Sequence, residues 1–262
     1  MSLYLDAIGV AMPGLDGWPA TGAVLRGETP WIAAPLPPHA PDLLPPNERR
    51  RATAAVRLAF KVAEQAMTTS GLSPSAIASV FASSDADTDV IHRICTALVR
   101  DGRAVSPTDF HNSVHNAAPG YWSIATRSTL PSVSLSAWDG VFAAGLVEAA
   151  GLVIVEQLPV LLVCYDTTAP EPLLATRGLA TASGVALLLS PTRSAASIAR
   201  LVIAATDEAE TRIDDEQLDA LRLDGTATRA LPLLQKLASG EPGRVVITAT
   251  GSRRIAIDLE LC

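Results

Sequence analysis

Hydrophobic positions in the first 205 residues alternate between strand-like runs and helix-like stripes. The strand-like runs are short, rich in valine, leucine or isoleucine, and bounded by proline, glycine or serine. They cover residues 3–10, 80–83, 160–164, 182–189 and 198–204. Apolar residues at three- and four-residue spacing between these runs are typical of helices that pack one face on a sheet. The alternation predicts a layered α/β fold whose sheet is buried on both faces.

The clearest helical stripe covers residues 48–70. Its apolar residues recur at helical spacing, and Gly71 follows as a stop signal. A proline-rich segment, residues 30–46, precedes this helix. It predicts a surface segment without helix or strand, because proline lacks the backbone N–H that regular structure needs. Further helices are predicted at residues 18–26, after Ser73-Pro74, at 89–100 and from Val141 to Ala150.

The C-terminal pattern differs from what precedes it. Residues 207–216 are acidic and predict a linker, a helix follows near residues 230–238, and residues 245–248 and 255–259 predict a hairpin around Gly251. The sequence contains no evident repeat. We therefore predict one domain over residues 1–262, with a core in 1–205 and the linker, helix and hairpin in 206–262.

Residues 110–140, FHNSVHNAAPGYWSIATRSTLPSVSLSAWDG, hold two of the four histidines and two of the four tryptophans. The pattern predicts a helix over 113–127, with Pro119-Gly120 delaying its start, and a strand over 132–136. Trp138-Asp139-Gly140 then forms a turn into an alanine-rich helix. Such a turn points backbone N–H groups and the positive end of a helix dipole at one place. Enzymes put a cysteine or serine nucleophile there.

The net charge of −7, with Lys61 and Lys236 as the only lysines, argues against nucleic acid and anionic membranes as partners. The apolar content of 48% predicts that the chain hides surface against a partner as well as within itself. The three cysteines, Cys95, Cys164 and Cys262, are unclustered. They indicate reduced thiols in the cytoplasm and no zinc site.

We expect no membrane span, because Glu148, Glu156 and Pro159 interrupt the longest apolar stretch, residues 141–163. The N-terminal residues do not read as a signal peptide, because Asp6 lies within a strand-like run. Both observations favour a cytoplasmic protein, and no motif points to a cofactor.

Two groups of residues have metal-like spacing. Asp85, Asp87 and Asp89 alternate as in a calcium loop but lack its glycine and terminal glutamate, which favours solvated charges at a helix start. His111 and His115 are four residues apart, which can place both imidazoles on one helical face, but no third ligand lies near them. We favour hydrogen bonding within a buried loop over metal binding.

A serine-type acyl hydrolase or acyltransferase is the alternative function that the residues allow. Ser136 or Ser134, with His111 or His115 and Asp139, has the composition of a catalytic triad. Against it, the G-x-S-x-G elbow is missing and both serines lie within the predicted strand. A homodimer with a purely structural role is a third alternative.

Four segments resemble the N-terminal half of a β-ketoacyl synthase of the thiolase superfamily. They are residues 8–18 (IGVAMPGLDGW), 44–51 (LPPNERRR), 106–126 (SPTDFHNSVHNAAPGYWSIAT) and 178–190 (GLATASGVALLLS). The resemblance is greatest to the chain-length-factor-type subunits of aryl polyene (xanthomonadin-type) pigment clusters. It implies a thiolase-like layered α/β half, with a mixed central sheet flanked by helices. It also implies a heterodimer with an active ketosynthase subunit, through which this chain meets the acyl carrier protein only indirectly.

The resemblance also implies that this chain has no catalytic residue. A ketosynthase needs a cysteine at the turn, where this chain has Trp138 and Asp139. It also needs two basic residues from its C-terminal half, usually histidines, and no histidine follows His115. By the same resemblance, residues near His115 lie at the subunit interface beside the acyl tunnel, and Trp138 can plug the tunnel from the turn side. The tunnel or interface candidates are Phe110, His111, Val114, His115, Asn116 and Trp122.

Overall fold

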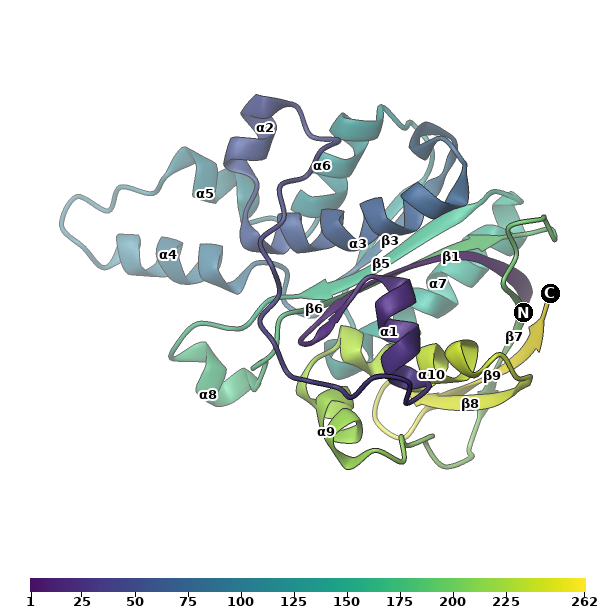
Figure 1. Ribbon diagram of the computed structural model, residues 1–262. Helices are drawn as coiled ribbons and strands as arrows, with labels where there is room; N and C mark the ends of the chain where they lie inside the picture. The colour runs from purple at the N-terminus through teal and green to yellow at the C-terminus, as the bar shows by residue number, and fades with distance from the viewer.

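A nine-stranded mixed sheet forms the centre of the computed structural model, which describes residues 1–262 (Figure 1). The strand order is β4-β3-β5-β6-β1-β7-β9-β8, and the short β2 pairs with β1. Strand β3 runs parallel to β4 and β5, whereas all other neighbours are antiparallel. The strands are β1 (Ser2–Met12), β2 (Leu15–Asp16), β3 (Ala78–Ala82), β4 (Ser132–Leu135), β5 (Val160–Asp166), β6 (Ser183–Ser190), β7 (Ala199–Thr206), β8 (Gly243–Thr248) and β9 (Arg254–Leu261).

Helices cover both faces of this sheet, as the alternating pattern predicts. Helices α3 and α6 pack on one face, and α7, α10 and α1 lie on the other (Figure 1). The helices are α1 (Trp18–Leu25), α2 (Pro46–Arg51), α3 (Ala54–Ser70), α4 (Thr88–Leu98), α5 (Pro107–Asn112), α6 (Ala117–Thr126), α7 (Val141–Glu156), α8 (Leu173–Arg177), α9 (Glu216–Asp224) and α10 (Leu231–Ser239).

The central strands read as continuous apolar runs because each is buried on both faces. In β5, Leu161 and Val163 pack in the core beneath α3, whereas Leu162 and Cys164 pack beneath α7. Helix α3 approaches the sheet so closely that a Cβ at Gly9 of β1 would overlap the backbone of Val62. Glycine at this position therefore sets the distance between the helix and the sheet.

Helix α7, together with the turn before it, is the one helical segment long and apolar enough to cross a membrane by length and composition. In the folded chain Phe142, Leu146 and Val153 of this helix are fully buried against the sheet. Its apolar character is thus accounted for by its place in the core.

One predicted helix is divided in two, and another begins later than predicted. The predicted helix over 48–70 is interrupted at Ala52, which is extended, and Thr53 then caps α3 by accepting from the Val56 N–H. The predicted helix over 113–127 is wrong at its start, because α5 ends at Asn112 and α6 begins only at Ala117. Pro119 fits the first turn of α6, where a missing N–H costs nothing.

The C-terminal hairpin is confirmed as β8 and β9, and it continues the main sheet through β7. The acidic segment before it has no helix or strand over residues 207–215, as a linker would. Asp215 then caps α9 by accepting from the N–H groups of Gln217 and Leu218, so that a helix follows the linker where the sequence predicted none. The hydrophobic pattern did not predict the short helices α5 and α8.

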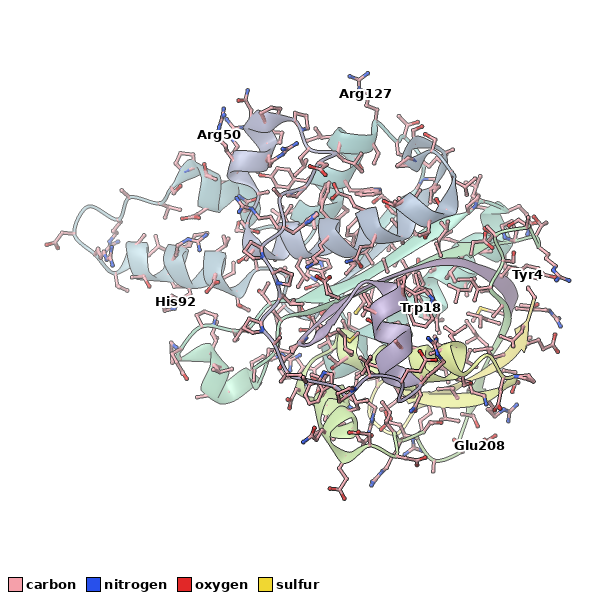
Figure 2. All side chains as sticks on the ribbon, in the orientation of Figure 1. Tyr4, Trp18, Arg50, His92, Arg127 and Glu208 are labelled. Carbon is pink, nitrogen blue, oxygen red and sulfur yellow. The ribbon has the colours of Figure 1, made fainter.

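Helices α4 and α5 form an arm that projects away from the body of the molecule (Figure 1; His92 marks α4 in Figure 2). The Arg93 guanidinium lies 2.7 Å from an Asp109 carboxylate oxygen and joins the two helices. Hydrophobic residues of α4 recur at helical spacing, yet only Val90 among them is buried. The arm therefore carries an apolar stripe that the chain itself does not cover.

Candidate functional site

The turn between β4 and α7 is the place where a nucleophile is expected, and it holds a tryptophan. Trp138 begins a single 3-10 turn that leads directly into α7, and its φ of 51° is in the left-handed region. This conformation costs a bulky residue about 1–3 kcal/mol. Strained strand-to-helix turns of this kind are used to expose a nucleophile. Here the exposed group is an indole, 58% accessible, which is not nucleophilic.

Arg177 of α8 fixes this tryptophan. Its guanidinium carbon lies 3.9 Å from the centre of the indole ring, and its nitrogens pair with Asp85 at 2.6 Å and Asp139 at 2.9 Å. Burial alone would lower the pKa of Arg177, but the hydrogen bonds to Asp139 and Asp85 outweigh burial and raise it. Asp139 is consequently engaged by a permanent cation, and it is not available as an acyl acceptor or as a partner for a histidine.

The β8–β9 loop covers the other side of the turn. Gly140 lies so close to Ala249 that a Cβ at position 140 would overlap the Ala249 carbonyl oxygen. A cavity of about 240 Å³ remains between the turn and the loop, and Arg229 and Thr250 contribute to its wall. No cysteine or histidine lines it.

None of the three cysteines lies at the turn. Cys95 is exposed on α4, Cys262 is the exposed last residue, and Cys164 is buried in β5. Burial raises the pKa of the Cys164 thiol well above its usual value. Because the thiolate is the reactive form, Cys164 is inert where it lies.

His115 is held by two hydrogen bonds rather than aimed at open space. Its Nε2 lies 3.0 Å from the Ser83 carbonyl oxygen and its Nδ1 lies 2.8 Å from Ser134 Oγ. A carbonyl only accepts, so Nε2 donates to Ser83, and the Ser134 hydroxyl also contacts the His115 carbonyl oxygen, to which it donates at 3.2 Å. Asn112 likewise donates to the Arg51 and Thr108 carbonyls. The preferred prediction, that this segment hydrogen-bonds a buried loop, is confirmed for these two residues.

The other metal-like groups also have structural roles. His111 is exposed and lies edge-on to Tyr121, with ring centres 5.8 Å apart. Asp87 caps α4 by accepting from the Val90 N–H, and Asp85 pairs with Arg177. No group of three potential metal-ligating side chains occurs in the chain.

The predicted serine triad is not assembled. Ser136 Oγ donates to the Ser84 carbonyl oxygen at 2.6 Å and has no histidine partner. Ser134 contacts His115, but it lies within β4, and Asp139 is bound to Arg177 instead of to an imidazole. The hydrolase alternative therefore loses its acid and its expected nucleophile.

A buried carboxylate beneath the site was missed at the sequence level. Asp166, at the end of β5, accepts from Ser83 Oγ at 2.7 Å, from the Ser84 N–H at 3.1 Å and from Thr226 Oγ1. The carbonyls of Ser83 and Ser84 in turn accept from His115 and Ser136. Asp166 thus anchors the loop on which both side chains rest. Parallel β3 and β5 end at the same sheet edge, which is the signal that could have identified this contact.

Burial is the larger influence on Asp166 and raises its pKa, although its hydrogen bonds lower it in part. The folded state therefore binds this proton more tightly than the unfolded chain. The free energy of unfolding therefore falls as the pH rises from 3.8, the ordinary pKa of an aspartate, through the raised pKa of Asp166. The loss is about 1.4 kcal/mol for each tenfold difference in proton affinity between the folded and the unfolded chain.

Asp166→Asn removes this ionisation. We expect the free energy of unfolding of the variant, relative to that of the wild type, to rise as the pH rises from 3.8 through the raised pKa of Asp166. Below pH 3.8 this difference should not change with pH. Urea unfolding at a series of pH values measures this, with Asp101→Asn on an exposed turn as the control. A difference between wild type and Asp166→Asn that stays constant with pH would contradict the assignment.

The six tunnel or interface candidates separate into three groups. Phe110, His111, Val114 and Asn116 are exposed at the base of the arm, and His115 is half-buried between them and β4. Trp122 is buried in the core, with its ring centre 5.3 Å from that of Phe60 and 6.3 Å from that of Phe81, so it is not on the surface of the single chain. The cavity beside Val114 and His115 has a volume of about 10 Å³, room for one water.

Comparison with known proteins agrees with this geometry. A model of the β-ketoacyl synthase N-terminal domain matches residues 26–243. Among solved structures, the chain is similar to the ketosynthase (ApeO) in complex with its chain length factor (ApeC) from Xenorhabdus doucetiae. That match has a TM-score of 0.75 and 22% identity, and covers 98% of this chain and 99% of that one.

Two further solved structures share the fold at lower identity. The ishigamide ketosynthase/chain length factor matches with a TM-score of 0.76 and 11% identity, over 100% of this chain and 99% of that one. The type II acyl-carrier protein complex AntDE:AntF, with its ketosynthase, matches with a TM-score of 0.73 and 12% identity over the same shares. No curated protein matches the sequence.

Proposed function

The chain belongs to the β-ketoacyl synthase N-terminal-domain family, and from this premise we propose that it is a chain-length-factor-type subunit that does not itself condense. It pairs with an active β-ketoacyl synthase that builds an aryl polyene or a related polyketide or fatty-acid-like chain. Two of the structural relatives named above are complexes of a ketosynthase with a chain length factor. The observation that carries the proposal is the turn itself, occupied by an immobilised indole.

Condensation requires a nucleophile that accepts the acyl group, and the chemistry of the turn does not provide one. Trp138 has the left-handed backbone conformation of the turn, and the Arg177 guanidinium stacks on its indole ring. Asp139 is neutralised by the same cation, and the Ala249 carbonyl closes on Gly140 from the other side. The helix dipole of α7 remains, but no thiol is present for it to activate.

Two adjacent surfaces of the chain support pairing with another protein. Strand β4 is the edge of the sheet, with β3 as its only neighbour, so its outer backbone groups lack strand partners. Next to it, the arm leaves Ile91, Leu98 and Phe110 exposed. An edge strand beside an uncovered apolar stripe is the pattern of an interface that a partner completes.

The acyl carrier protein then reaches this chain only through the active subunit, since the growing acyl chain is bound there. AntDE:AntF is a complex of a carrier protein with its ketosynthase. We place the pair in the cytoplasm, which is supported by three cysteines that form no disulfide.

Leu98→Asp tests the interface. Leu98 is 48% exposed on α4, so a charge there leaves the fold intact, whereas burial of an unpaired carboxylate against a partner is costly. We expect the amount of co-purified ketosynthase to fall at least tenfold.

The matched control is Leu223→Asp, because Leu223 is 51% exposed but lies on α9, away from the arm. It should co-purify with the ketosynthase as the wild type does. Equal capture by both variants would show that the arm is not the interface.

A further inference from the structure

A second cavity lies away from the turn, beneath the proline-rich segment that joins α1 to α2. This segment crosses the front of the molecule as an extended strap (Figure 1). Between the strap and the first half of α3 there is a cavity of about 320 Å³. Leu36 of the strap, Leu58 of α3 and Ala182 before β6 give it an apolar wall. It shares no lining residue with the cavities beside Trp138 and His115.

The side chains with nitrogen atoms that line this cavity are those of Lys61, His39 and Arg57. Lys61 is buried, with Nζ 2.8 Å from Asp16 Oδ2 and 3.4 Å from the Pro37 carbonyl oxygen, so its charge is balanced. His39 likewise contacts Glu64, at 2.7 Å. No carboxylate belongs to the cavity lining.

Arg57 is the one cation of the cavity whose charge is not balanced. Its Nε donates to the Ala52 carbonyl oxygen at 3.1 Å, and no carboxylate oxygen lies within 4.0 Å of its guanidinium. The two terminal nitrogens are therefore free to bind an oxyanion in a bidentate manner. Thr167, which lines the same cavity, adds a hydroxyl.

We propose that this cavity binds an amphipathic anion, with a carboxylate or phosphate head on Arg57 and a short apolar body against Leu36, Leu58 and Ala182. Its volume lies at the lower end of the range of small-molecule sites, and an apolar wall with a few convergent polar groups is their usual composition. Pro37 and Pro38 make the outer wall rigid, so little ordering cost opposes binding. This site is independent of the ketosynthase-partner function.

The test is calorimetric titration of the full chain with octanoate and, separately, with octyl phosphate. Octanol supplies the apolar body without a charge, and inorganic phosphate supplies a charge without the body. We expect octanoate or octyl phosphate to bind, and the tighter of the two identifies the preferred head group. Octanol and inorganic phosphate should each bind at least tenfold more weakly.

Three variants locate the binding. Arg57→Gln should weaken it at least tenfold, since it removes the only unbalanced charge. Ala182→Phe, which fills the cavity, should abolish it. Arg50→Gln is the control, because Arg50 is an exposed arginine on α2 that points away from the strap (Figure 2). No binding by the wild type, or equal binding by wild type and Arg57→Gln, overturns the proposal, and so does octanol binding as tightly as octanoate.

Discussion

Gly140→Ala is expected to destabilise the chain by about 3 kcal/mol, with the β8–β9 loop forced off the turn. The reason is steric, because a methyl group at this position would occupy the place of the Ala249 carbonyl oxygen. Backbone atoms cannot rotate away as a flexible side chain can. Either the loop moves or the start of α7 does, and both movements break contacts of the buried Val141 and Phe142. Urea unfolding measures the loss of free energy.

Gly151→Ala is the matched control, since it lies in the same helix. Nothing lies within 4 Å of a Cβ built at Gly151. Alanine is favoured over glycine inside a helix by about 0.5–1 kcal/mol, so this variant should be as stable as the wild type or more stable. If the two variants unfold at the same urea concentration, the β8–β9 loop does not pack on the turn.

Val114→Phe should shorten the product of a reconstituted ketosynthase pair by at least one extension unit. Val114 is 51% exposed beside β4, where the partner of the edge strand would lie. A larger side chain there takes space from a tunnel shared by the two subunits. His115→Phe is a weaker probe, because it also removes the hydrogen bonds to Ser83 and Ser134.

Product masses from the pair, with and without the substitution, give the result. Val155→Phe is the control, since Val155 is an exposed valine at the far end of α7 from the turn. It should leave the product distribution unchanged. An unchanged distribution with Val114→Phe, in a pair that still co-purifies, would remove position 114 from the tunnel.

The sheet could be predicted from the sequence because its strands are buried on both faces. A strand such as β5 must then be apolar at every position, and this is visible without any partner strand. Helix breaks were harder to locate. Thr53 and Asp215 start α3 and α9 through single side-chain caps, and the apolar pattern alone gave the wrong boundary for α3 and no helix for α9.

The candidate site was predictable in position but not in its contacts. The turn at Trp138 follows from a strand, a glycine and an apolar helix that are adjacent in sequence. Arg177 and Asp166 come from other elements, 39 and 28 residues further on, and only the fold brings them to the turn and to Ser83. Trp122 was a tunnel or interface candidate through the resemblance alone, and the sequence did not show that the helical phase of α6 turns it toward Phe60 and Phe81.

Condensation by the purified chain, alone and then mixed with the active ketosynthase, tests the central claim most directly. Both samples receive acyl and malonyl groups on the carrier protein, and intact-protein mass spectrometry follows the acyl group. We expect the chain alone to carry no acyl group and to form no product, and the pair to be acylated on the ketosynthase only and to form the extended chain. An acyl thioester on this chain, with product formed in the absence of the ketosynthase, would contradict the account.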